Sequence, residues 1–409
     1  MINVTKRLLR LPGNAASSSG ARDLVTRTLA QHGLMAPPAE SSHGSSTPPS
    51  DSSQGLLKGS ASDTQREPLS DSLRGSLSGS LRGSMPGSLS DSMPESMRGL
   101  VGNLPEFGLP SANASRRHVQ IPEGAEFRQD IHACAAGSRA YRTYISSTAD
   151  QGLTGLIVML HGCTQNPEDF AIGTDMNAWA EKGRFVVVYP QQSRGDNAQS
   201  CWNWFSRADQ QRDRGEPAIL AGMTRKVMAE HGVLPQHTFV AGLSAGAAMA
   251  VILGETYPDV FAAVGAHSGL PFGAARDVPS AFAAMAGNGT DTAGNVPGAR
   301  RPRVPTIVFH GAADTTVHPS NGDRIARQAV CGESQQSVMR ELRGSVSGRA
   351  YTRQLSSGVD GSCELEYWMV DGLGHAWSGG QPGGSYTDGK GPDASAEMVR
   401  FFFERNAAE

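Results

Sequence analysis

Short runs of consecutive apolar residues recur along the chain after residue 114, and segments with helical patterning separate them. Runs of this length and composition are typical of strands that are buried on both faces of a parallel sheet. Strands that alternate with helices predict an α/β fold, with a mostly parallel central sheet flanked by helices. The runs are 156–160, 185–189, 237–241, 261–264, 306–309 and 365–370.

The third run leads directly into the small-residue motif GLSAG at 242–246, and an alanine-rich stretch follows. A strand that turns sharply into a helix and exposes a serine is a nucleophile elbow, typical of α/β-hydrolases. The flanking glycines fit this interpretation, because side chains two residues from the serine would collide with the neighbouring strand and helix. Ser244 is therefore the candidate nucleophile, and an ordinary turn serine is the alternative.

Two further runs are followed by a candidate acid and a candidate base. Both lie C-terminal to the serine in the sequence, in the order that an α/β-hydrolase requires. Asp314 follows the run 306–309, and His375 lies in a glycine-bracketed loop after the run 365–370. In such sites a histidine takes the proton of the serine hydroxyl, and a carboxylate orients and stabilises that histidine. The alternatives are Asp323 and Asp371 for the acid, and His318 and His267 for the base.

Four motifs together resemble the poly(3-hydroxybutyrate) depolymerase family of serine esterases, which is related to feruloyl and acetylxylan esterases. They are HGCTQ at 161–165, CWNWF at 201–205, GLSAGAAM at 242–249 and GHAWSGG at 374–380. The resemblance extends from about Ala114 to the C-terminus, the length of a single α/β domain. It implies an α/β-hydrolase domain at 115–409 whose triad is Ser244, Asp314 and His375.

The same resemblance implies that the backbone amides of Cys163 and Ala245 form an oxyanion hole. A tetrahedral intermediate needs such preorganised donors, and losing one typically costs about 2.7–4 kcal/mol in the transition state. Ala245 is expected in the first turn of the elbow helix, where the helix dipole favours negative charge. His161 precedes the other site residues, and we interpret it as shaping the oxyanion loop.

Aromatic residues make up only 6% of the chain, yet five of them fall next to these motifs. Such side chains bury apolar surface while their polar tips reach a partner, which suits an aliphatic ester chain. Trp202, Trp204 and Trp377 are therefore predicted to bind substrate, with Tyr189 and Tyr386 in adjoining loops. The alternative is that some of them only pack the loops. No charged cluster accompanies them, which disfavours an anionic substrate.

The five cysteines leave two arrangements open. Their spacing contains no pattern typical of a metal site, so neither a metal nor a cofactor is expected. In one arrangement Cys163 pairs with Cys201 and Cys331 with Cys363, which leaves Cys134 free. In the other, all five are small buried thiols in a reducing compartment.

Residues 1–114 are rich in Ser, Gly and Pro and contain few aromatic residues. Such a segment buries too little surface to fold, which predicts a mostly disordered tract with a short amphipathic helix at 22–30. Leu or Met recurs there at every fourth residue from Leu69 to Met97. The intervening Gly and Pro residues oppose a helix, so the repeats are a flexible spacer or a multivalent contact for a hydrophobic surface.

The net charge of −3 gives no indication of nucleic-acid binding, and no run is long enough to span a membrane. The N-terminal residues are basic but lack the apolar stretch of a secretory signal, which favours a cytoplasmic location. Together with this location, the family resemblance implies a serine esterase of poly(3-hydroxybutyrate) or its oligomers, associated with polyester granules. Export by a less obvious signal stays open, as does the oligomeric state.

A carbohydrate-linked ester hydrolase of the feruloyl or acetylxylan esterase kind is the alternative function, because it would use the same triad. A non-catalytic granule-binding protein would lack a member of the triad. Candidates for all three members are present.

Overall fold

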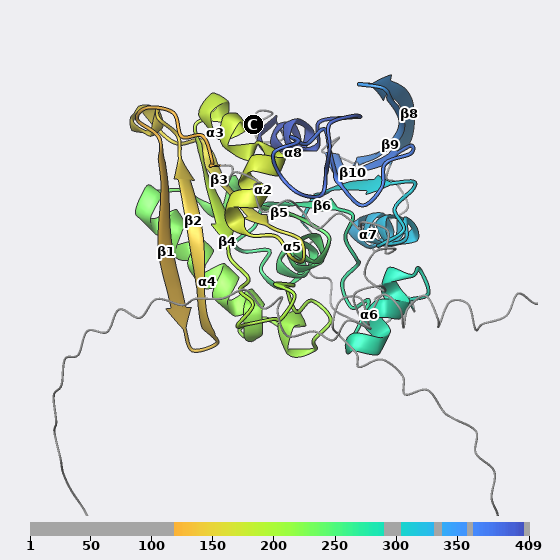
Figure 1. Cartoon of the computed structure of the whole chain (residues 1–409), viewed down its shortest axis with the longest axis horizontal. Coiled ribbons are helices and arrows are strands. Elements are labelled where there is room, and N and C mark those ends of the chain that lie inside the picture. The colour runs from red at the N-terminus through yellow and green to blue at the C-terminus, as the bar shows by residue number, and fades with distance from the viewer. Residues whose placement is uncertain (1–117, 290–303, 331–337, 358–362, 405–409) are drawn as a thin grey trace, which may run out of the picture. The chain divides into compact units, whose positions relative to one another are not determined.

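The computed structural model describes residues 118–289, 304–330, 338–357 and 363–404. They form a large sheet covered by helices on both faces (Figure 1). The predicted tract at 1–114, with its helix and its repeats, lies outside the described residues.

The main sheet of the described residues has ten strands in the order β1-β2-β4-β3-β5-β6-β7-β10-β9-β8. The inner strands from β4 to β10 run parallel to one another, and an antiparallel hairpin flanks them on each side. The strands are β1 (Glu126–Cys134), β2 (Gly137–Ile145), β3 (Gly155–Leu160), β4 (Phe185–Pro190), β5 (Thr238–Leu243), β6 (Ala263–His267), β7 (Thr306–Gly311), β8 (Val338–Val346), β9 (Arg349–Ser357) and β10 (Cys363–Val370). A separate two-stranded ladder pairs β11 (Trp377–Ser378) with β12 (Thr387–Asp388).

Helices cover both faces of this sheet. The first face carries α4 (Gly215–His231), α5 (Ala245–Thr256), α6 (Val278–Met285) and α7 (Ser320–Val330); the second carries α2 (Pro167–Thr174), α3 (Met176–Gly183) and α8 (Ala394–Glu404). This arrangement confirms the predicted fold class, an α/β-hydrolase with a mostly parallel central sheet.

The alternation of side chains along each inner strand supplies two separate cores. In β3, Leu156, Val158 and Leu160 join the core beneath α4 and α5, whereas Ile157 and Met159 join the core beneath α3 and α8. Every residue of β3 is buried, which is why its sequence is a continuous apolar run.

All six predicted strands are present, although one is shifted along the chain. The sequence places a strand at 261–264, whereas β6 begins at Ala263 and continues to His267. Phe261 instead belongs to the turn after α5, where its N–H donates to the carbonyl of Tyr257 at 3.1 Å. Its apolar side chain is buried against the helices rather than in a strand.

Candidate active site

Ser244 lies between β5 and α5, at the carboxyl end of a central parallel strand. Its φ of 57° and ψ of −119° are values that a non-glycine residue rarely adopts. Its N–H donates to the carbonyl of His267 at 2.9 Å, and its own carbonyl accepts from the N–H of Ala248 at 3.0 Å. These bonds fix the turn, and the serine remains partly exposed where strand meets helix.

The two glycines of the elbow are required by close packing. A Cβ atom at Gly242 would lie 2.7 Å from the carbonyl oxygen of Leu160, and one at Gly246 would lie 2.6 Å from that of His161. Real Cβ atoms do not approach backbone so closely, so a side chain at either position would push α5 away from β3. The collision expected from the sequence is therefore present.

Asp314 and His375 lie side by side, although 61 residues separate them in the sequence. Nδ1 of His375 donates to Oδ2 of Asp314 at 2.8 Å, and the amides of Thr316 and Val317 each donate to Oδ1 at 2.9 Å. Burial alone would raise the pKa of Asp314, but the hydrogen bond and charge of His375, with the Val317 amide, lower it overall. The carboxylate is thus ionised, and Nε2 of His375 is the nitrogen that can accept a proton.

A second histidine, which the sequence analysis does not single out, borders the same carboxylate. His310 lies one residue before the end of β7, with its Nε2 3.6 Å from Oδ2 of Asp314. The same Nε2 donates to the carbonyl of Val317 at 2.8 Å. Its side chain is fully buried, and burial lowers its pKa, so the ring is neutral. Its place at the end of a buried strand, four residues before the acid, is the signal that would have found it.

The alternative acids and bases have other surroundings. Asp323 accepts from the hydroxyl of Tyr367 at 2.9 Å, and Asp371 is exposed. His318 is exposed and lies 2.9 Å from the hydroxyl of Ser320. His267 is buried beneath the site, where Nε2 accepts from the amide of Ser378 at 3.0 Å and burial lowers its pKa to about 3.

The loop after β3 reaches the serine from the neighbouring strand. A Cβ atom at Gly162 would lie only 3.7 Å from the Cβ of Ser244. On either side of Cys163, the amide of Gly162 donates to Oε1 of Gln165 at 2.9 Å, and the amide of Thr164 donates to the carbonyl of Gln199 at 2.8 Å. These bonds hold the peptide that carries the Cys163 amide.

Ala245 is the first residue of α5, which confirms its expected place in the elbow helix. The first amides of a helix have no acceptor within the helix, so they are available to a developing oxyanion. The two predicted donors, Cys163 and Ala245, therefore lie on the two segments that meet at Ser244.

His161 holds the oxyanion loop from the interior. Its Nδ1 donates to the carbonyl of Gly162 at 2.8 Å, and its Nε2 accepts from the amide of Gln192 at 3.1 Å. Burial lowers its pKa to about 4, so both bonds persist with a neutral ring at pH 7. This supports its interpretation as a loop-shaping residue.

A disulfide between Cys163 and Cys201 ties the oxyanion loop to the segment that follows β4. It confirms one of the two predicted pairs and excludes the arrangement with five buried thiols, and Cys134 is free and exposed. The other predicted pair includes Cys331, which lies outside the described residues.

The prediction that three tryptophans contact substrate is wrong, because all three belong to the interior. Trp202 is 0% exposed, Trp377 1% and Trp204 6%. The indole N–H of Trp202 donates to the carbonyl of His161 at 3.1 Å, and that of Trp377 donates to the hydroxyl of Ser395 at 3.1 Å. The indole N–H groups of Trp202 and Trp377 thus bind the protein's own acceptors.

The loop between β11 and β12 is bound to the oxyanion loop. Nε2 of Gln165 donates to the carbonyl of Ser385 at 3.0 Å, and the amide of Ser385 donates to Oδ1 of Asp169 at 2.9 Å. The β11–β12 loop is consequently held against the oxyanion loop and α2.

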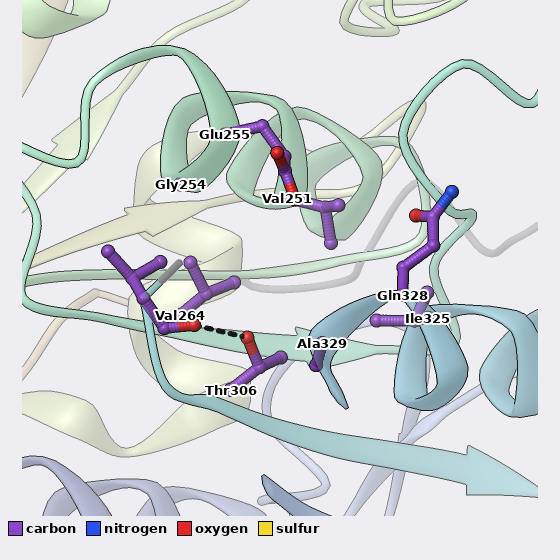
Figure 2. A pocket seen from close by; sticks show the side chains of 9 residues that line it. Val251, Gly254, Glu255, Val264, Thr306, Ile325, Gln328 and Ala329 are labelled. Atoms are coloured by element: carbon purple, nitrogen blue, oxygen red, sulfur yellow. Dashed lines mark hydrogen bonds between the residues drawn. The ribbon is translucent and has the colours of Figure 1, made fainter. Parts of the chain in front are cut away.

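A separate pocket lies between α5 and α7, at the amino ends of β6 and β7 (Figure 2). Ligands of open α/β sheets bind at the carboxyl ends of the strands. Ser244 lies at those carboxyl ends, at the opposite end of the strands from this pocket.

In the described ranges, no three His, Cys, Asp or Glu side chains gather as a metal site would require. None of the helices found there is long and apolar enough to cross a membrane.

Known proteins with similar sequences are ester hydrolases by name. The chain is 33% identical over 233 residues to poly(3-hydroxyalkanoate) depolymerase C of Paucimonas lemoignei, and the matched region covers 54% of each protein. It is 30% identical over 190 residues to the probable acetylxylan esterase A of Aspergillus fumigatus, and the matched region covers 42% of this chain and 50% of that esterase. The chain spans about half the length of these curated relatives.

Among solved structures, the acetyl xylan esterase from Aspergillus awamori has the same fold, with a TM-score of 0.52 at 19% identity. That similarity covers 68% of this chain and 99% of the esterase. The family described as Esterase PHB depolymerase matches residues 139–335, so this part of the chain is similar to that family.

Proposed function

We propose that this protein is a serine ester hydrolase in which Ser244 is the nucleophile, His375 the general base and Asp314 the residue that orients it. One observation carries the proposal: the 2.8 Å hydrogen bond between His375 and the buried, ionised Asp314, on the same sheet edge as the Ser244 elbow. A carboxylate in this position selects the tautomer that leaves Nε2 free for the serine proton.

In the proposed reaction, Oγ of Ser244 attacks the ester carbonyl carbon while Nε2 of His375 takes its proton. The resulting oxyanion accepts hydrogen bonds from the Cys163 and Ala245 amides. Collapse breaks the bond to the alcohol, which leaves with the proton from His375, and an acyl-enzyme remains. Water then attacks the acyl carbon and gives a proton to Nε2 of His375. The bond between the acyl carbon and Oγ breaks, His375 returns the proton to Oγ of Ser244, and the carboxylic acid is released.

For the substrate we propose poly(3-hydroxybutyrate) or its oligomers. Two similarities support this choice: residues 139–335 match the family described as Esterase PHB depolymerase, and one relative is named poly(3-hydroxyalkanoate) depolymerase C. A carbohydrate-linked ester is the second candidate, supported by the relatives named acetylxylan esterase. The deciding experiment compares rates on amorphous polyester granules, soluble 3-hydroxybutyrate oligomers, acetylated xylan and methyl ferulate. Faster hydrolysis of either carbohydrate-derived ester than of both hydroxybutyrate substrates would reject the first candidate.

The disulfide bears on the compartment in which the protein works. Structural disulfides persist in oxidising surroundings, so the Cys163–Cys201 bond argues against the cytoplasmic location that the N-terminal sequence favours. Cell fractionation combined with alkylation of free thiols before lysis tests this. A cytoplasmic enzyme with alkylated Cys163 and Cys201 would restore the original expectation.

We also propose that residues 1–114 retain the enzyme on a polyester surface. Leu and Met side chains spaced along a tether each bury little surface, but together they raise the local concentration of the catalytic domain. Deleting the tract is expected to reduce granule co-sedimentation and polymer hydrolysis and to leave p-nitrophenyl butyrate hydrolysis nearly unchanged. Equal loss on both substrates would mean that the tract supports folding instead.

A further inference from the structure

Tyr386 has the exposure that the predicted substrate-binding tryptophans lack. It is 46% exposed, and it is the only aromatic residue among the exposed large apolar side chains of the described residues. Its ring centroid lies 6.4 Å from that of His375, with the two ring planes at 77°. An aromatic surface therefore borders the proposed general base.

The hydroxyl of Tyr386 is hydrogen-bonded to the oxyanion loop. It shares a hydrogen bond of 3.1 Å with the hydroxyl of Thr164, the residue after the proposed oxyanion donor Cys163. Tyr386, in the β11–β12 loop, thus borders the ring of His375 and contacts the oxyanion loop. With its polar tip occupied, the exposed ring offers mainly apolar surface.

The backbone at both ends of this bridge is held in an unusual conformation. Thr164 has a φ of 66° and Tyr386 a φ of 51°, left-handed values that are rare for β-branched and aromatic residues. The carbonyl of Tyr386 accepts from the amide of Trp377 at 2.8 Å, and the preceding Ser385 is bound by Asp169 and Gln165. Surroundings that impose such a conformation are common at ligand sites.

We propose that Tyr386 is a specificity-determining residue whose ring forms the wall on which the apolar chain of the ester lies beside His375. Thr164 holds that ring in place through the shared hydrogen bond. The inference rests on the proposed esterase function and adds the class of substrate group that this wall takes, an uncharged aliphatic chain. It also assigns to Tyr386 the aromatic contact that the sequence analysis gives to the tryptophans.

The test measures kcat and KM on p-nitrophenyl acetate, butyrate and octanoate. Tyr386→Ala is expected to raise KM about tenfold for octanoate and less than about twofold for acetate, with kcat nearly constant, because the lost contact grows with each methylene. The control is Leu234→Ala, an apolar residue that is 55% exposed just before β5, at the opposite edge of the sheet. It is expected to leave all three esters unchanged.

Two milder variants separate the ring from its tether. Tyr386→Phe and Thr164→Val each remove one partner of the same hydrogen bond, so both are expected to weaken octanoate binding by a similar, smaller factor. Their double variant is expected to be no worse than either alone, since residues that act through one contact are not additive. Additive losses would overturn the role given to Thr164.

Labelling of Ser244 by a fluorophosphonate distinguishes failure of the inference from failure of the proposed function. Wild-type protein that neither labels nor hydrolyses any of the three esters would overturn both. Wild-type labelling and hydrolysis, together with a Tyr386→Ala variant whose KM changes equally for all three esters or not at all, would overturn the inference alone.

Discussion

Nδ1 of His375 lies 2.8 Å from Oδ2 of Asp314, and the two residues reach this distance because β7 and β10, which precede them, are adjacent parallel strands. The contact therefore depends on sheet register as much as on the two loops. It also gives the most direct test of the proposed triad.

Asp314→Asn is expected to lower kcat by about 10⁴-fold, because an amide group facing Nδ1 favours the wrong tautomer of the base. Asp323→Asn is the matched control, since Asp323 was the alternative acid and contacts Tyr367 instead. Steady-state kinetics on p-nitrophenyl butyrate measure both. A larger loss in the control than in Asp314→Asn would reject the assignment of the acid.

Ser244→Ala is expected to abolish ester hydrolysis and fluorophosphonate labelling with the fold intact, because it removes the hydroxyl that the elbow presents. Ser347→Ala is a suitable control, since Ser347 also has a left-handed backbone, with a φ of 47°, but lies in the turn between β8 and β9. Circular dichroism checks the fold. Undiminished labelling of Ser244→Ala would contradict the proposal.

Breaking the Cys163–Cys201 disulfide is expected to lower both activity and stability. The bond joins residues 38 apart, and closing a loop of that size is worth about 4 kcal/mol of unfolding free energy. The double variant Cys163→Ser, Cys201→Ser is also expected to lower kcat, because the Cys163 amide must stay precisely placed to act as a donor. Urea unfolding and kinetics measure the two effects.

Thiol counting provides an independent check of the same bond. Two of the five cysteines are joined, so at most three thiols are expected in denatured, unreduced protein. In the native protein the exposed Cys134 is expected to react. Five reactive thiols after denaturation would rule out any disulfide.

The free energy of unfolding is expected to fall as the pH falls from 7 to 5. Burial lowers the pKa of His161 to about 4 and of His267 to about 3, from 6.5, so the unfolded chain binds more protons in this range. Stability is then lost as pH falls below 6.5, by about 2 kcal/mol at pH 5 for each of these histidines. Denaturant titrations at both pH values measure the change.

The variant His267→Gln separates this effect from general acid sensitivity. It removes one of the two titrating rings and keeps a side-chain oxygen that can accept from the amide of Ser378. The variant is expected to show a smaller pH dependence by about 2 kcal/mol. An unchanged dependence would mean that His267 does not contribute to it.

Sequence reasoning is most successful where residue type and position follow from backbone geometry. The elbow of Ser244 could be predicted because only glycine fits at 242 and 246, where a Cβ atom would meet backbone of the β3 segment. The strands could be predicted because burial on both faces demands an uninterrupted apolar run, as in β3.

Burial of aromatic residues in loops could not be predicted in the same way. Trp202 lies in a segment without regular structure, yet that segment is held inside by the Cys163–Cys201 bond and by the hydrogen bond from the indole to His161. Such long-range contacts leave no local pattern. The β8–β9 hairpin also leaves no such pattern, because its edge strand exposes residues such as Met339 and Leu342 and carries no apolar run.

The sheet order described above determines when the site can exist during folding. Four strands, β3, β5, β7 and β10, are each followed by a segment of the proposed site, which carries Cys163, Ser244, Asp314 and His375 in turn. His375 therefore reaches Asp314 only when β10 has paired with β7. A slip of one residue would displace a loop by about 3.3 Å, several times the tolerance of a catalytic contact. Reactivity of Ser244 toward a fluorophosphonate would therefore report completion of the sheet, and in refolding it would recover later than the secondary structure.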